Sequence, residues 1–177
     1  MNLREALLAE HSKALTLQIV SYIGDDKERF AELMRLFLND VPRITQRSAW
    51  AVNYVAEKSP HLIEPYLVSM LQNLSKNEVH DAIARNTVRA LKDMPNLENQ
   101  SDEVVGLLVD VCFRYLEDPS VAVAIKAFSM MILDRLCVRE PDLLNEMLPL
   151  IEDQLPHATP AFKGIGTKIL KKWQSKK

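Results

Sequence analysis

Residues 60–74 of the chain, PHLIEPYLVSMLQNL, place apolar side chains at five positions that recur twice further along the sequence. The pattern that begins at Leu62 returns at Val104 and again at Leu143. Apolar residues at this spacing mark the buried face of an amphipathic helix. The matching positions are Leu62, Ile63, Leu67, Met70 and Leu74, then Val104, Val105, Val109, Cys112 and Leu116, then Leu143, Leu144, Leu148, Ile151 and Leu155.

A second set of helices lies between these and repeats independently. Over two repeats, both sets are displaced by the same number of residues along the sequence. The first set runs from Leu62 to Leu143, and the second runs from Ile44 to Ile125. Unrelated helices would have little reason to share a register, so the chain carries an internal repeat of about 40 residues. The second set is Ile44, Ser48, Ala49, Ala51, Val52 and Val55, then Ile83, Thr87, Val88, Ala90, Leu91 and Met94, then Ile125, Ser129, Met130, Ile132, Leu133 and Leu136.

This period is typical of HEAT and armadillo arrays, in which each helix pair buries its apolar face against its neighbours. Residues 47–67, RSAWAVNYVAEKSPHLIEPYL, resemble the second helix, the turn and the next first helix of HEAT and importin-like repeats. Residues 116–121, LEDPSV, resemble the family's turn between paired helices. The resemblance extends over about residues 25–174. It implies an all-α fold, a right-handed α-α superhelix (a HEAT-like solenoid) of about nine antiparallel helices.

The domain organisation expected from this pattern is one HEAT-like repeat domain over residues 1–177. Within it we expect an N-terminal capping helix in residues 1–24, about four helix pairs over 25–174, and a basic tail at 175–177. Proline favours the first turn of a helix, which predicts helix starts at the prolines, and Ser101 predicts another as a cap. The prolines are Pro42, Pro60, Pro119, Pro141 and Pro160. The expected helices are 2–23, 25–39, 42–57, 60–74, 78–94, 102–117, 119–139, 141–155 and 160–174.

Composition restricts the class of protein and its compartment. The chain has 177 residues, 47% hydrophobic residues and a net charge of −2, so no global field attracts nucleic acid or an anionic membrane. The first residues resemble no signal peptide, and no apolar run approaches the ~20 residues of a membrane helix. Cys112 and Cys137 lie in separate apolar runs, which indicates buried reduced thiols. We therefore expect a cytoplasmic protein.

No pattern of catalytic or metal-binding residues stands out. The four histidines form no i, i+4 pair, and acids at Asp25, Asp26 and Glu28 suit the first turn of a helix. Gly164 and Gly166 lack the strand that a phosphate-binding loop requires, which favours close helix packing instead. We expect no enzyme activity, no metal and no cofactor.

The second helices supply a candidate surface for a protein or peptide partner, because they would line the concave side of a solenoid. Arg, Trp and Tyr dominate interface energetics, and several lie on these helices. Arg47, Arg85 and Lys126 resemble the family's recurring basic position. In the apolar register, however, Arg47 aligns with Asn86 and Arg85 with Ala127, so the three match only after a one-residue slip. The predicted surface comprises Arg43, Arg47, Trp50, Tyr54, Arg85, Arg89 and Lys126.

Two further hypotheses remain open. DNA-alkylation-repair glycosylases are also HEAT-like and grip DNA with a basic concave surface, although this chain offers no evident aromatic and carboxylate pocket for a base. Alternatively, the chain assembles with copies of itself by end-to-end stacking. A basic C-terminal patch could also contact phosphates or an acidic segment. Its predicted residues are Lys163, Lys168, Lys171, Lys172 and Trp173.

Overall fold

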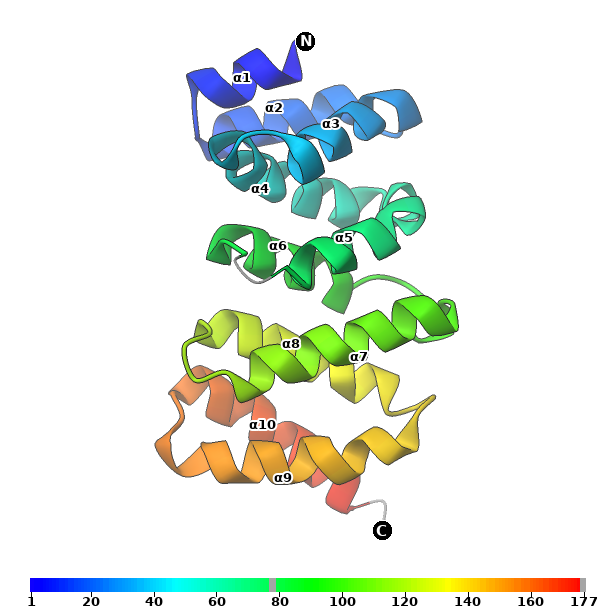
Figure 1. The fold of residues 1–177 in the computed structure, drawn as a ribbon, viewed down its shortest axis with the longest axis vertical. Coiled ribbons are helices and arrows are strands. Elements are labelled where there is room, and N and C mark those ends of the chain that lie inside the picture. Colours follow the sequence, from blue (N-terminus) through cyan, green and yellow to red (C-terminus); the bar gives the residue numbers. More distant parts are fainter. Residues whose placement is uncertain (77–78, 176–177) are drawn as a thin grey trace. The chain divides into compact units, whose positions relative to one another are not determined.

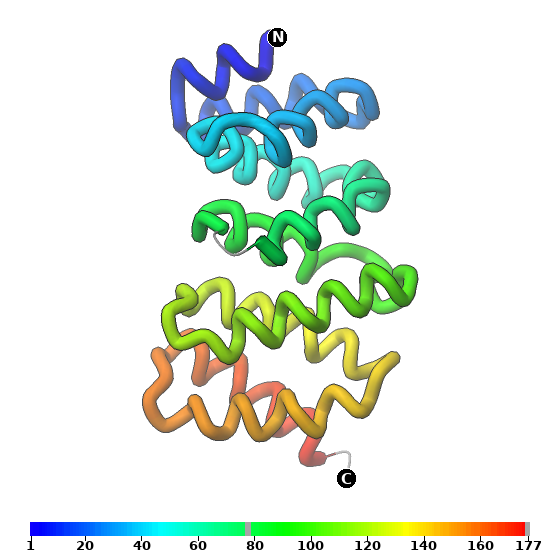
Figure 2. Tube along the Cα trace, viewed as in Figure 1, coloured from blue at the N-terminus to red at the C-terminus, as the bar shows by residue number. Residues whose placement is uncertain are grey.

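The computed structural model describes residues 1–76 and 79–175, and within these ranges the chain is helical with no β-strand. This confirms the all-α fold class. The chain forms two compact units, unit 1 over Met1–Pro95 and unit 2 over Asn96–Lys177, and each is described by itself. In both units, successive helices run back and forth through short connections (Figure 1; Figure 2).

Unit 1 is built around its longest helix, α4, which packs against α3 and α6 and also touches α1 and α2. These contacts bury most of the apolar face of α4, so the packing of α4 sets where the neighbouring helices lie. The elements are α1 (Leu3–Ala9), α2 (Lys13–Ile23), α3 (Lys27–Asn39), α4 (Pro42–Lys58), the 3-10 turns η1 (Pro60–Leu62) and η2 (Glu64–Tyr66), α5 (Leu67–Leu74) and α6 (Asp81–Lys92).

Unit 2 has α8 at its centre, packed against α7 on one side and α10 on the other. Helix α9 contacts α7 and α10. The elements are η3 (Leu97–Asn99), α7 (Asp102–Glu117), α8 (Val123–Leu136), η4 (Pro141–Leu143), α9 (Leu144–Gln154), η5 (Leu155–His157) and α10 (Pro160–Gln174).

The repeated apolar positions form the core, as the internal repeat predicts. Every position of the second set is buried in all three copies, including the small hydroxyl residues Ser48, Thr87 and Ser129. The first set is buried in its first two copies except for Val109. In the third copy only Ile151 is fully buried, and the other four positions are half-buried.

The predicted single helix at 2–23 is wrong, because the structure has two helices there. Helix α1 ends at Ala9, and Ser12 begins α2 by accepting a hydrogen bond on Oγ from the Leu15 amide at 3.1 Å. A serine cap of this kind satisfies an amide that has no partner inside the helix. Residues 10–12 therefore form a corner between α1 and α2.

Proline marked some helix starts correctly and others only in part. Pro42 and Pro160 begin α4 and α10, and Ser101 caps α7 as predicted. Pro60 and Pro141 begin 3-10 turns instead of α-helix. The start predicted at Pro119 is wrong, because Asp118 accepts hydrogen bonds from Ser120 and holds a turn until α8 begins.

Two predicted boundaries involve positions that lie outside the described residues. The helix predicted at 78–94 corresponds to α6, which begins at Asp81, whereas position 78 is not described. Of the basic tail predicted at 175–177, only Ser175 is described.

Both thiols and one of the two α10 glycines have packing roles. Burial raises the pKa of Cys112 to about 12 and that of Cys137 to about 11, so both thiols stay protonated. A Cβ on Gly166 would lie 2.9 Å from Ile151 Cγ2, which explains the close approach of α10 and α9. Gly164 has open space around it, so the packing explanation holds for Gly166 alone.

Candidate functional site

Unit 1 has a surface hollow of about 340 Å³ between α4 and α6. Positions 46 and 50 of α4 are one turn apart. On α6, positions 85 and 86 follow position 82, and position 89 follows them, at the three- or four-residue spacing of one helix face. Each helix therefore presents one stripe of side chains to the hollow. Its lining residues are His11, Gln46, Trp50, Ala82, Arg85, Asn86 and Arg89.

Aromatic rings form one wall of this hollow. The His11 and Trp50 ring centroids are 5.5 Å apart, with their planes at 60° in an edge-to-face contact. Tyr54 lies one turn further along α4, with its ring 6.2 Å from that of Trp50. Trp50 and Tyr54 are half-buried, so they combine packing within unit 1 with exposed aromatic surface.

Two guanidinium groups and a buried amide form the opposite wall. Arg85 is exposed and makes no ion pair or hydrogen bond with any residue in the described ranges. Arg89 lies 3.7 Å from Glu57 Oε1, and both of these side chains are largely exposed. Asn86 is 8% exposed and donates from Nδ2 to the Ala82 carbonyl at 2.7 Å, which leaves Oδ1 able to accept. The hollow thus combines positive charge with amide donors and acceptors.

Two other predicted residues on α4 lie outside the hollow. Arg47 donates from its guanidinium to the carbonyls of Leu7 and Leu8 at 2.6 and 3.1 Å, which closes the C-terminal end of α1. Arg43 is exposed near the start of α4 and does not line the hollow. Of the predicted surface in unit 1, the structure brings together Trp50, Arg85 and Arg89, with Tyr54 adjoining.

Lys126 does not fit the predicted exposed row. It belongs to unit 2, is 8% exposed, and donates from Nζ to the Leu116 carbonyl and to Gln154 Oε1, both at 3.1 Å. Burial lowers the pKa of Lys126, and the charge of Asp118 opposes this effect. Since its ammonium binds groups inside unit 2, we remove Lys126 from the candidate surface.

The predicted C-terminal patch divides into internal and exposed parts. Lys172 Nζ lies 2.7 Å from Asp134 Oδ2, and Trp173 donates from Nε1 to Asp134 Oδ1 at 2.6 Å, so both residues tie α10 to α8. Lys163 donates to the Pro156 carbonyl, also within unit 2. Lys163 is nevertheless exposed, as are Lys168 and Lys171, so these three are the accessible members of the patch.

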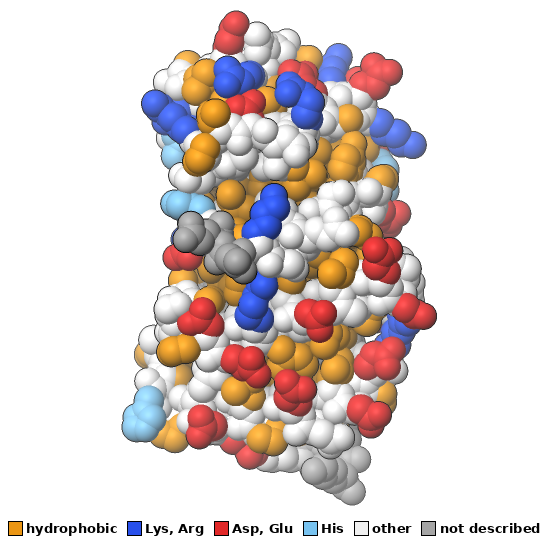
Figure 3. Space-filling model, viewed as in Figure 1, with side chains coloured by type: hydrophobic (Ala, Val, Ile, Leu, Met, Phe, Trp, Pro, Cys, Tyr) orange, Lys and Arg blue, Asp and Glu red, His pale blue; other side chains and the backbone are white. Residues whose placement is uncertain are grey.

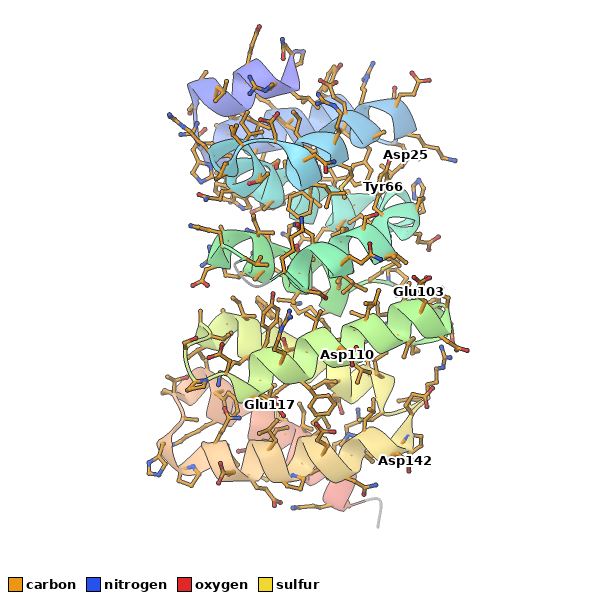
Figure 4. All side chains as sticks on the ribbon, in the orientation of Figure 1. Asp25, Tyr66, Glu103, Asp110, Glu117 and Asp142 are labelled. Atoms are coloured by element: carbon orange, nitrogen blue, oxygen red, sulfur yellow. The ribbon has the colours of Figure 1, made fainter. Side chains whose placement is uncertain are left out.

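The first helices of unit 2 have the opposite charge. Acidic side chains gather over α7 and α9 on the face shown in Figure 3. Glu103, Asp110 and Glu117 lie along α7 in Figure 4, and all three are exposed. Asp142, also labelled there, belongs to η4 before α9. A negative ligand is therefore better accommodated by the hollow of unit 1 than by this face.

Sequence reasoning assigned no role to His11, which was counted only as one of four histidines without an i, i+4 partner. The His11 ring contacts the Trp50 ring because the chain turns a corner at residues 10–12, where a continuous helix was predicted. The signal was Ser12, whose side chain favours a helix start. Gln46 was missed as well. Its place in the lining of the hollow follows from the packing of α4 against α6, which the sequence does not give.

The described residues contain no group of three or more His, Cys, Asp or Glu placed to hold a metal ion. None of the described helices combines the length and apolar character needed to cross a bilayer.

The fold and the hollow together define a helical repeat protein with a candidate binding surface on its second helices. A family model of the HEAT repeat domain matches residues 3–173, and the chain belongs to this family. No curated protein and no solved structure matches the chain.

Proposed function

We propose that the protein is a non-catalytic cytoplasmic scaffold that binds a protein partner along α4 and α6 of unit 1. The observation that carries this proposal is the hollow between these helices, with Trp50 on one wall and Arg85 and Arg89 on the other. Aromatic and arginine side chains contribute most to interface energetics when a partner covers them. HEAT repeats present successive second helices as a continuous binding surface, which agrees with this location.

An exposed arginine without an ion pair is a better candidate contact residue than an arginine that already binds groups of its own unit. Arg85 has no ion pair within the described residues, so a partner's acidic group would gain a charge-assisted hydrogen bond without breaking an existing one. Arg47, by contrast, already binds carbonyls of α1 and is not proposed as a contact residue.

The test begins with capture from native lysate on immobilised protein, with and without nuclease, followed by purification of the main partner. We expect the double variant Arg85→Ala, Arg89→Ala to weaken the measured affinity roughly tenfold or more. Arg35→Ala is the matched control, because it removes an exposed guanidinium from α3 of the same unit. We expect this control to stay within about twofold of the wild type.

Unchanged affinity in the double variant would overturn the proposed surface. Capture that disappears after nuclease treatment would instead favour the nucleic-acid hypothesis. Two observations count against that alternative: the net charge is −2, and the residues lining the hollow include no carboxylate to assist base excision.

A further inference from the structure

The positions of Arg85 and Arg89 create an unbalanced positive charge. They lie one turn apart on α6, which places their Cβ atoms about 6 Å apart, and both line the hollow, so their like charges repel. The only ion pair of either within the described residues is the 3.7 Å approach of Arg89 to Glu57. Because that pair is open to solvent, it holds Arg89 only weakly. An anion held between the two guanidinium groups would relieve the repulsion.

The remaining walls suit a peptide that carries such an anion. The Asn86 amide has a bonded Nδ2 and an Oδ1 that can accept a peptide N–H. Trp50 and His11 offer an aromatic surface against which a neighbouring residue can pack.

Building on the binding surface proposed above, we propose that this hollow binds a phosphorylated serine or threonine side chain of the partner. A carboxylate carries one charge and pairs with one guanidinium fork. A phosphate monoester carries about −1.5 to −2 charges and three acceptor oxygens, so it can bridge both arginines at once. Two arginines on one helix face, of which only Arg89 approaches a carboxylate, match the dianion better than they match a single carboxylate.

Glu57 acts as an internal competitor in this arrangement. Its Oε1 lies 3.7 Å from Arg89 Nη2, so an anionic ligand competes with it for this guanidinium. Glu57→Gln should therefore tighten phosphopeptide binding by about threefold to tenfold, since it removes both the competitor and a nearby negative charge. Glu64→Gln provides a charge-matched control, because Glu64 is an exposed acid in η2 of unit 1 that does not line the hollow.

The experiment uses the full chain and fluorescently labelled short peptides that contain one phosphoserine between randomised residues. Matched mixtures carry serine or glutamate in its place, and affinity is read by anisotropy. We expect the serine and glutamate mixtures to bind at least about tenfold more weakly than the phosphoserine mixture. Arg85→Ala should remove this difference, and Glu57→Gln should tighten the phosphoserine mixture more than the glutamate mixture and leave the serine mixture unchanged.

Equal affinity for the glutamate and phosphoserine mixtures would overturn the proposal in favour of a carboxylate site. Phosphoserine binding that survives Arg85→Ala would overturn it as well. Equally tight binding of a single-stranded oligonucleotide would reveal an unselective anion surface and would also count against it. If the purified partner binds in an Arg85-dependent manner after phosphatase treatment, the scaffold function stands and the phosphate inference fails.

Discussion

The basic residue Lys126 on a second helix of unit 2 and Arg85 on a second helix of unit 1 have different surroundings. In unit 2, Lys126 is buried and bonded to the Leu116 carbonyl and to Gln154. In unit 1, Arg85 is exposed and lines a hollow with Trp50. Arg47 of unit 1 resembles Lys126 more than Arg85, because it binds the carbonyls of Leu7 and Leu8.

The difference follows from the acceptors within reach of each side chain. Arg47 meets carbonyls at the end of α1, and Lys126 meets one near the end of α7, where helical carbonyls lack partners of their own. Arg85 meets no such acceptor among the described residues, so its donors stay exposed at the surface. Of these three basic residues, two therefore bind carbonyls where a neighbouring helix ends, and the third stays exposed because no helix ends beside it.

Charge distribution separates the units further. Residues 1–95 hold twelve Lys and Arg against twelve Asp and Glu, whereas residues 96–177 hold ten against twelve. In the second range every acid precedes residue 154, and the six lysines from Lys163 onward all follow it. Unit 1 is thus balanced overall with a local positive hollow, and unit 2 has an acidic portion followed by a basic helix.

The largest effect should come from Lys126→Met. The substitution removes two hydrogen bonds from a charged group inside unit 2, although the cost of burying that charge disappears as well. We expect a loss of about 2 kcal/mol in the free energy of unfolding, measured by urea denaturation. Lys168→Met on exposed α10 is the control. Equal stability of the two variants would contradict a structural role for Lys126.

An intermediate effect is expected for Arg47→Ala. This change leaves two carbonyls of α1 without their protein donor, for an expected loss of about 1–2 kcal/mol. Amide hydrogen exchange should speed up in α1 more than in the rest of unit 1. Arg43→Ala, one turn earlier on α4, should change neither quantity. Unchanged exchange in α1 would show that Arg47 does not hold this helix.

The smallest effect on stability is expected for Arg85→Ala. Because Arg85 is exposed and bonded to no described residue, its removal should change the free energy of unfolding by less than about 0.5 kcal/mol. Urea denaturation of this variant beside Lys126→Met and Arg47→Ala completes the comparison. A loss above about 1 kcal/mol would indicate an unrecognised structural contact and would weaken the assignment of Arg85 to ligand binding.

The sequence predicted the fold well because the repeat is recorded in local apolar spacing. The second set of repeated positions is buried throughout, and the helix at Asp102–Glu117 has the predicted bounds. The corner at residues 10–12 was missed, because apolar residues continue on both sides and only Ser12 marks the break.

The candidate surface was less accessible to sequence reasoning. Trp50, Arg85 and Arg89 could be placed on neighbouring second helices from the repeat alone. The burial of Lys126 could not, because it depends on Gln154, which is distant in the sequence, and on the place where α7 ends. Spacing along a helix identifies which side chains share a face but not which acceptors approach that face.

The placement of the cysteines has a consequence for measuring how the molecule opens. Both thiols are buried in unit 2 and none belongs to unit 1. A thiol-modifying reagent added under native conditions therefore reports the transient opening of unit 2 alone, on a timescale set by how often its core becomes exposed. Each unit also has its own indole, Trp50 in one and Trp173 in the other, so fluorescence can follow each unit separately once the other tryptophan is replaced.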